Sequence, residues 1–197
     1  TDHGGVVAET PDQAVHEADF IITMLSDGAA VDAILAGPEL RAALRRGSLW
    51  IDMSSTQPTQ ARAQSARLDE LGIAHLDAPV SGGTKGAEAA SLAIMVGGQE
   101  KAFSAALPVL SVLGRPVHVG PSGSGQLAKL ANQAIVAVTI GAVAEAMLLL
   151  DKGGADPEAV RDALRGGFAD STILQQHGTR MTTNNFVPGG LSKLQLK

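Results

Sequence analysis

The chain changes character near residue 120, and this change constrains its fold more than any other feature. Before that point, short runs of β-branched and apolar residues alternate with segments of helical pattern. The expected strands are residues 6–8, 19–25, 49–53, 74–78, 91–96 and 116–119. Continuous apolar runs of this kind are typical of strands buried on both faces of a parallel sheet. The alternation predicts part of an α/β doubly wound, Rossmann-type sheet.

After residue 120 the strand signals stop. Residues 125–152 are expected to form one helix, because the sequence is rich in alanine and contains no turn signal. Two shorter helices are expected to follow it, starting near residues 157 and 172. We therefore expect an α/β domain over residues 1–120 and an all-α domain, built on the long helix, over residues 121–197.

Composition removes several classes of function. The 197 residues include no cysteine, which excludes disulfides, thiolate zinc sites and thiol nucleophiles. The five histidines lack metal-ligand spacing, so no metal site is expected. The formal net charge is −5 and no basic run exceeds Arg45-Arg46, which disfavours nucleic acid as a partner.

Membrane and targeting signals are not expected either. The longest apolar stretch, residues 134–150, is interrupted by Thr139, Gly141 and Glu145 and falls short of the roughly 20 residues that span a bilayer. No signal-peptide pattern opens the chain, which agrees with a cytoplasmic location. The chain lacks an initiator methionine and its first residues look like the end of a helix, so we expect a fragment of a longer protein.

A run of small residues follows one predicted strand. Ser81, Gly82 and Gly83 come just after residues 74–78, at the carboxyl end of that strand, where α/β folds bind ligands. Glycines let an anion approach the backbone N–H groups closely. The alternative is a tight turn without a ligand.

A lysine lies near the start of the long apolar helix. Lys129 is followed three and four residues later by Asn132 and Gln133, which share its helical face. Burial would lower the lysine pKa from about 10.4 toward the range useful for acid–base catalysis. The alternative is a surface lysine whose stem lies on apolar neighbours.

The glycines before this lysine permit two interpretations. Residues 123–128 match the G-x-G-x-x-A dinucleotide fingerprint, with Asp151 as the acid that should follow. No turn separates Gly125 from Met147, however, and we favour a close contact between helix and strand. The polar segments 25–27 and 54–56, at the ends of two other strands, are either helix caps or the lining of a cofactor groove.

Together these segments resemble the β-hydroxyacid dehydrogenase family, which includes 3-hydroxyisobutyrate dehydrogenase and tartronate semialdehyde reductase. The resemblance covers essentially the whole chain and is carried by the string 77–83 and by the lysine helix from Gly123. It implies that Lys129 is the catalytic acid/base. The substrate-binding residues that it implies are Ser81, Gly82, Gly83, Asn132 and Gln133.

The resemblance also implies NAD or NADP as the cofactor. The implied contacts are Leu25, Ser26, Ser55 and Lys197. Most members have proline where this chain has Ser26, and the strand and G-x-G-x-x-G loop that open the family's sequences are not found here, nor are its last helices. The chain by itself is therefore expected to bind the cofactor poorly and to be inactive.

The expected function of the whole protein is hydride transfer between NAD or NADP and a small β-hydroxy acid or its semialdehyde. A homodimer or homotetramer is expected, as in the family. Two alternatives stay open: an imine reductase of the same fold, which Lys129 argues against, and a non-catalytic module of that fold.

Overall fold

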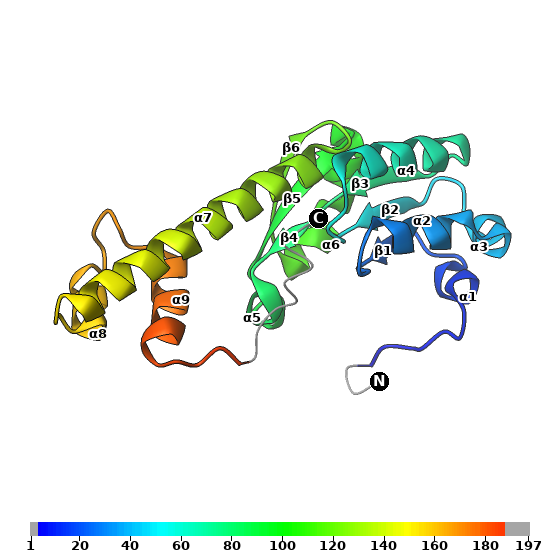
Figure 1. The fold of residues 1–197 in the computed structure, drawn as a ribbon. Helices are drawn as coiled ribbons and strands as arrows, with labels where there is room; N and C mark the ends of the chain where they lie inside the picture. Colours follow the sequence, from blue (N-terminus) through cyan, green and yellow to red (C-terminus); the bar gives the residue numbers. More distant parts are fainter. Residues whose placement is uncertain (1–3, 188–197) are drawn as a thin grey trace. The chain divides into compact units, whose positions relative to one another are not determined.

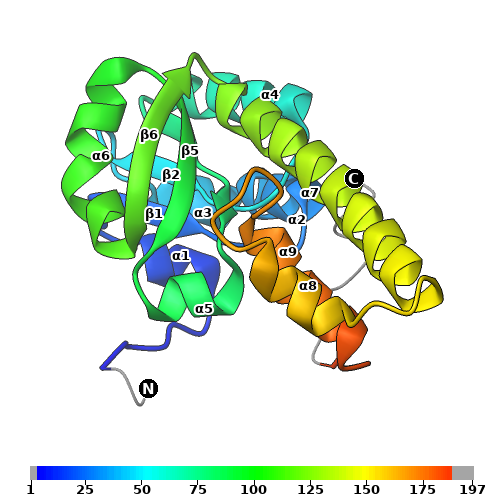
Figure 2. The same cartoon turned by 90° about the vertical axis from the view of Figure 1, so that its left-hand side faces the viewer.

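The computed structural model describes residues 4–187, and its first part is built on a mixed sheet (Figure 1). The strands are β1 (Phe20–Thr23), β2 (Leu49–Asp52), β3 (Ala74–Asp77), β4 (Val80–Ser81), β5 (Leu92–Gly98) and β6 (Gly114–Gly120). β1, β2 and β3 are parallel neighbours, and β5 runs antiparallel to β3 and to β4. β6 lies parallel beside β5 (Figure 2).

Helices connect these strands and continue after the last one. In the sheet part they are α1 (Pro11–Val15), α2 (Gly28–Ala36), α3 (Pro38–Ala43), α4 (Pro58–Glu70), α5 (Gly83–Glu88) and α6 (Glu100–Leu113). The chain then continues through α7 (Ser124–Lys152), α8 (Pro157–Ala163) and α9 (Thr172–Thr182). The predicted α/β sheet followed by helices is confirmed.

The sheet part has a hydrophobic cluster on each of its faces. β2 is buried along its whole length, and its side chains alternate between the two clusters. Ile51 packs with Leu76 and with Leu110 of α6 in one cluster. Trp50 packs with Leu68 of α4 and other helix residues in the second. The largely apolar run of residues 49–53 therefore predicted this buried strand correctly.

Three local predictions were wrong. β1 is not buried on both faces, because it is the edge strand and leaves Phe20 39% and Ile22 43% exposed. Residues 6–8 form no strand, and Val6 is almost fully exposed. β4 and α5 were not expected; they arise because the chain after β3 turns back to pair Val80 with Ile94 of β5.

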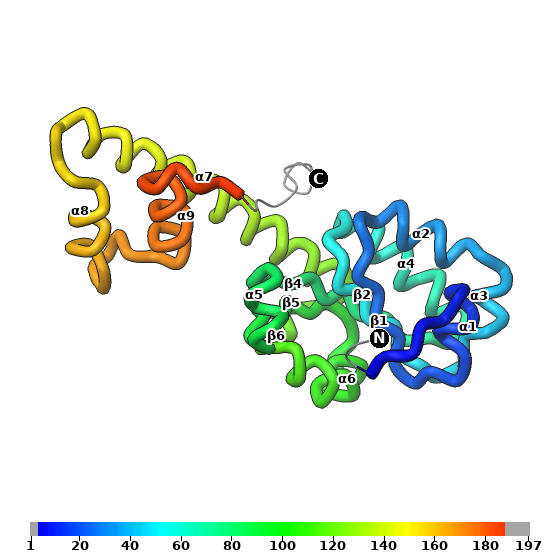
Figure 3. The backbone as a smooth tube through the Cα atoms, turned by 90° about the horizontal axis from the view of Figure 1, so that it is seen from below, coloured from blue at the N-terminus to red at the C-terminus, as the bar shows by residue number. Residues whose placement is uncertain are grey.

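The described residues form two compact units, the first ending at Leu130 and the second beginning at Ala131. In the second unit, Leu174 of α9 packs against Val143 and Met147 of α7. Asp156 and Ser171 accept hydrogen bonds from the first turns of α8 and α9 and so cap them. Figure 3 shows α8 and α9 beside the end of α7.

α7 is a single unbroken helix, as predicted. Its 29 residues include a window with a mean hydropathy of 2.0, so by length and composition it is long and apolar enough to cross a membrane. The expectation that no segment reaches this length was therefore wrong, because the helix continues through the three residues that interrupt the apolar run. The core helix of a soluble protein passes the same test, but such a helix is mostly buried, whereas 11% of this window is buried among the described residues.

Candidate active site

Lys129 on α7 is held in place by a backbone carbonyl. Its Nζ donates a hydrogen bond of 2.7 Å to the carbonyl oxygen of Val80, the first residue of β4. Burial lowers the pKa of the Lys129 ammonium below its usual value. The side chain is therefore not a freely solvated surface lysine, and its ammonium group lies beside the residue that precedes Ser81.

Ser81, Gly82 and Gly83, which we call the 81–83 turn, link β4 to α5. Ser81 pairs with Ala93 of β5, and Gly83 is the first residue of α5. Gly82 has φ +140° and Gly83 has φ +62°, conformations that residues with a side chain rarely adopt. A Cβ on Gly82 would also lie 3.1 Å from Cδ2 of Leu92. The turn thus requires glycine, and both glycines are exposed.

The start of α7 is fixed by a buried carboxylate. Asp77, the last residue of β3, accepts hydrogen bonds from the N–H groups of Gly123 at 2.8 Å and Gln126 at 2.9 Å. These N–H groups are the ones that a phosphate would use at a helix N-terminus. Because a side chain of the protein already occupies them, residues 123–128 are not a phosphate-binding loop.

Gly125 confirms the alternative interpretation of this motif. A Cβ at Gly125 would lie 2.3 Å from the carbonyl oxygen of Asp77 and 2.5 Å from that of Met95. The glycine therefore allows α7 to approach β3 and β5, which is the close contact between helix and strand that the sequence favoured.

A buried glutamine connects α7 to the loop after β2. Gln126 is 1% exposed; its Nε2 donates to the carbonyl oxygen of Ser54 at 2.8 Å, and its Oε1 accepts from the N–H of Thr56 at 3.0 Å. No role for Asp77 or Gln126 was predicted from the sequence. The sequence did contain a signal for these roles. Asp77 is a polar residue at the end of an apolar strand, and Gln126 is a polar residue in the first turn of an apolar helix.

The residues predicted to contact the cofactor after β1 and β2 lie on adjacent loops. The N–H of Leu25 donates to Ser54 Oγ at 2.9 Å, and the N–H of Ser54 donates to Asp52 Oδ1 at 3.1 Å. Ser26 and Ser55 are the next residues of the two loops. β1 and β2 are parallel, so these loops meet at the carboxyl edge of the sheet.

The remaining predicted residues belong to the second unit or lie outside the described residues. Asn132 and Gln133 belong to the second unit, where Asn132 Nδ2 donates to Gln133 Oε1 at 2.9 Å. Lys197 is outside the described residues. Across residues 4–187, no group of three potential metal ligands is found.

Comparisons with known proteins cover both parts of the chain. Residues 1–123 match the family model for the NAD binding domain of 6-phosphogluconate dehydrogenase. Residues 123–197 match the model for the NAD-binding region of NADP-dependent 3-hydroxyisobutyrate dehydrogenase. Both models describe nicotinamide-dinucleotide-binding domains, in agreement with the predicted cofactor class.

Individual relatives point the same way. The chain is 45% identical over 189 residues to 2-hydroxy-3-oxopropionate reductase of Escherichia coli, covering 94% of this chain and 64% of that protein. A structure of Mycobacterium tuberculosis 3-hydroxyisobutyrate dehydrogenase with L-serine has a TM-score of 0.87 at 37% identity, covering 98% of this chain and 69% of the other. An imine reductase from Myxococcus stipitatus has a TM-score of 0.75 at 25% identity and covers 83% of this chain and 58% of that one.

The chain thus spans 64% and 69% of the length of the first two of these relatives and 58% of the imine reductase. The first family model covers the sheet part, and the second covers α7 and the helices that follow it. The motif 77–83 and the lysine helix, from which the resemblance was first drawn, both lie within the matched regions. On these matches, the chain belongs to the β-hydroxyacid dehydrogenase family of NAD(P)-dependent enzymes.

Proposed function

We propose that the whole protein transfers a hydride between NAD(P) and a small β-hydroxy acid or its semialdehyde, as its named relatives suggest. One observation carries the proposal: the Lys129 ammonium donates to the carbonyl oxygen of Val80 at 2.7 Å, directly before the 81–83 turn. A proton donor is thereby placed next to exposed backbone that can receive an acid.

Lys129 is proposed as the general acid and base. In reduction its ammonium gives a proton to the carbonyl oxygen of the semialdehyde, and in oxidation its neutral amine takes the proton of the hydroxyl group. The lowered pKa supports this role, because it reduces the difference in free energy between the ammonium and the neutral amine near neutral pH. The bond to Val80 orients the ammonium group and restricts its movement.

The 81–83 turn is proposed to bind the substrate carboxylate. The absence of side chains at Gly82 and Gly83 leaves their backbone open, and the N–H groups of such a turn can surround an anion. Asn132 and Gln133 follow Lys129 by three and four residues along α7, and we assign them to the reacting oxygen. The mycobacterial relative was solved with L-serine, which is itself a β-hydroxy acid.

The cofactor is assigned to the carboxyl edge of β1 and β2. NAD(P), when bound, accepts or supplies the hydride. The loops that carry Leu25, Ser26 and Ser55 meet there, and the neighbouring Met24 is 63% exposed, so this edge can receive a partly apolar ring. We assign residues 1–120 to a cofactor domain and residues 121–197, which begin with the lysine helix, to substrate binding and self-association.

Self-association is proposed because α7 carries apolar side chains that the described residues leave exposed. Ile135 is 66%, Val138 is 74% and Leu149 is 71% exposed. Exposed apolar groups at this density mark a surface that is covered by another part of the assembly. A second copy of the protein is the occupant that we propose.

The test is an assay of the full-length protein with tartronate semialdehyde, 3-hydroxyisobutyrate and succinic semialdehyde, each with both nicotinamide cofactors. Lys129→Ala is expected to lower turnover by a factor of about 100 or more while cofactor affinity, measured by fluorescence, is unchanged. Lys101→Ala, which removes an exposed lysine of α6, is the matched control. Near-normal turnover in Lys129→Ala would contradict the lysine role.

The same assay separates the second candidate. The similarity to a solved imine reductase favours testing a cyclic imine with NADPH and NADH. Reduction of the imine without turnover of any hydroxy acid would replace the proposed function, and turnover of neither class would indicate a non-catalytic module.

A further inference from the structure

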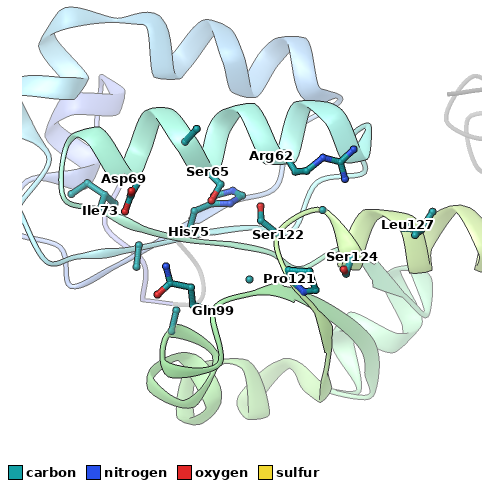
Figure 4. A pocket seen from close by; sticks show the side chains of 15 residues that line it. Arg62, Ser65, Asp69, Ile73, His75, Gln99, Pro121, Ser122, Ser124 and Leu127 are labelled. Atoms are coloured by element: carbon teal, nitrogen blue, oxygen red, sulfur yellow. The ribbon is translucent and has the colours of Figure 1, made fainter.

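A cavity that Lys129 does not line lies within the first compact unit. It has a volume of about 670 Å³ and is bounded by α4, the amino end of β3, the start of α6 and the loop 121–124 (Figure 4). The 81–83 turn follows the carboxyl end of β3, and neither the turn nor Lys129 lines this cavity. We call it the β3 pocket. Its volume is in the range of pockets that hold small organic ligands.

A buried histidine without hydrogen bonds forms part of its wall. His75 of β3 is 5% exposed, and among residues 4–187 neither of its ring nitrogens has a hydrogen-bond partner. Burial lowers its pKa to about 4, so the ring is neutral at physiological pH. A neutral imidazole has one N–H donor and one acceptor nitrogen, and leaving both unpaired when buried is costly.

Two hydroxyl groups line the same cavity. Ser122 Oγ is buried and likewise has no partner in the described part of the chain. Ser65 lines the pocket from α4, and His75 lines it from β3 (Figure 4). Hydroxyl groups, like the imidazole, both donate and accept. These groups together match a ligand that carries a hydroxyl group.

The charges of the pocket are separated along α4. Arg62 and Asp69 lie on the same helix face as Ser65, and seven residues place them about 10 Å apart along the axis. Arg62 lies close to the loop that carries Ser122, since a Cβ at Gly123 would be 2.8 Å from its Nη1. Within residues 4–187 its guanidinium has no ion pair. The end of the pocket at Ser122 is therefore the one suited to a carboxylate.

We propose that the β3 pocket is a second binding site, for a small hydroxy-carboxylate whose carboxylate meets Arg62 and whose hydroxyl meets His75 and Ser122. This site does not depend on the proposed hydride transfer, because none of its residues is assigned to that reaction. Ordered water is the competing occupant, since water also donates and accepts.

The probe is L-malate, added to full-length protein with ¹⁵N-labelled histidine. The ring ¹⁵N resonances of His75 are expected to shift on addition of malate, and glycerol, which has hydroxyl groups but no carboxylate, is expected to leave them unchanged. Reading the signal at His75 distinguishes this pocket from the Lys129 site, so the Lys129→Ala variant is expected to give the same shift.

Substitutions test the two groups proposed to bind the carboxylate and the hydroxyl of the ligand. Arg62→Gln and Ser122→Ala are each expected to weaken malate binding about tenfold. Asp69→Asn, which changes the charge at the opposite end of the same helix face, is the control and is expected not to weaken it. Arg62 and Asp69 are both exposed, so these two variants leave the core intact.

Three results would overturn the proposal. Ring resonances of His75 that do not respond to malate at any concentration would mean that only water occupies the pocket. Malate affinity that is unaffected by Arg62→Gln, or equal binding of glycerol, would mean that the site does not recognise a carboxylate.

Discussion

Asp77 and His75 lie two residues apart in β3, and both are buried, yet they differ completely in hydrogen bonding. Both oxygens of Asp77 accept backbone N–H groups at the start of α7. The ring of His75 has no partner within the described residues. At the scale of the residue, Asp77 determines where the lysine helix begins, whereas His75 is available to a ligand.

His75 predicts a loss of stability in acid. Its pKa is about 4 in the folded protein and near 6.5 when unfolded, so only the unfolded state takes up a proton between these values. The contribution is complete above pH 6.5 and is lost as the pH falls to about 4, by about 3 kcal/mol in all. Urea denaturation across this range should show the loss in the native protein and a smaller loss in His75→Phe.

The comparison between the two proteins is needed because other buried groups titrate. Burial raises the pKa of Asp52 and of Asp77, so the folded state binds protons more readily than the unfolded state at these sites, and their effect has the opposite sign. Both carboxyls are present in either protein, and their effect cancels. Identical pH profiles for the two proteins would show that His75 is not held neutral.

At the scale of the element, α7 depends on a contact that leaves no room for a side chain. Gly125→Ala would place a methyl group against the backbone of β3 and β5, at 2.3 Å from the Asp77 oxygen. Backbone atoms cannot move as a flexible side chain does, so we expect a loss of about 3 kcal/mol in the free energy of unfolding or failure to fold.

Gly141→Ala is the matched control in the same helix. A Cβ at Gly141 meets nothing within 4 Å in the described chain. Alanine is favoured over glycine inside a helix by about 1 kcal/mol, so this variant should be as stable as the native protein or more stable. Thermal unfolding of the two variants measures the difference, and equal destabilisation would refute the close contact at Gly125.

At the scale of the whole molecule, the exposed apolar side chains of α7 predict self-association. Ile135→Lys and Val138→Lys together should reduce the mass of the full-length protein in sedimentation, because a charge is costly to bury in an apolar interface. Val112→Lys, at a valine of α6 that is 71% exposed, is the control. An unchanged mass in the double variant would exclude α7 as the surface of self-association. If the native protein instead sediments together with lipid vesicles, the exposed apolar side chains of α7 would be assigned to membrane binding.

Local sequence pattern determined much of this protein. The largely apolar run of β2 and the uninterrupted α7 both follow from neighbouring residues, since helix and strand preferences act over short distances. The motif 77–83 and the lysine helix were sufficient to identify the family.

Tertiary structure decided what depends on residues far apart in the chain. The exposure of β1 follows from its place at the sheet edge, and β4 exists only because the chain turns back onto β5. The bonds of Lys129 to Val80 and of Asp77 to Gly123 join positions more than 40 residues apart. Hydrophobic periodicity indicates which face of an element is buried, but it does not indicate which polar groups lie against that face. The surroundings of Lys129 and the β3 pocket could therefore be identified only from the folded structure.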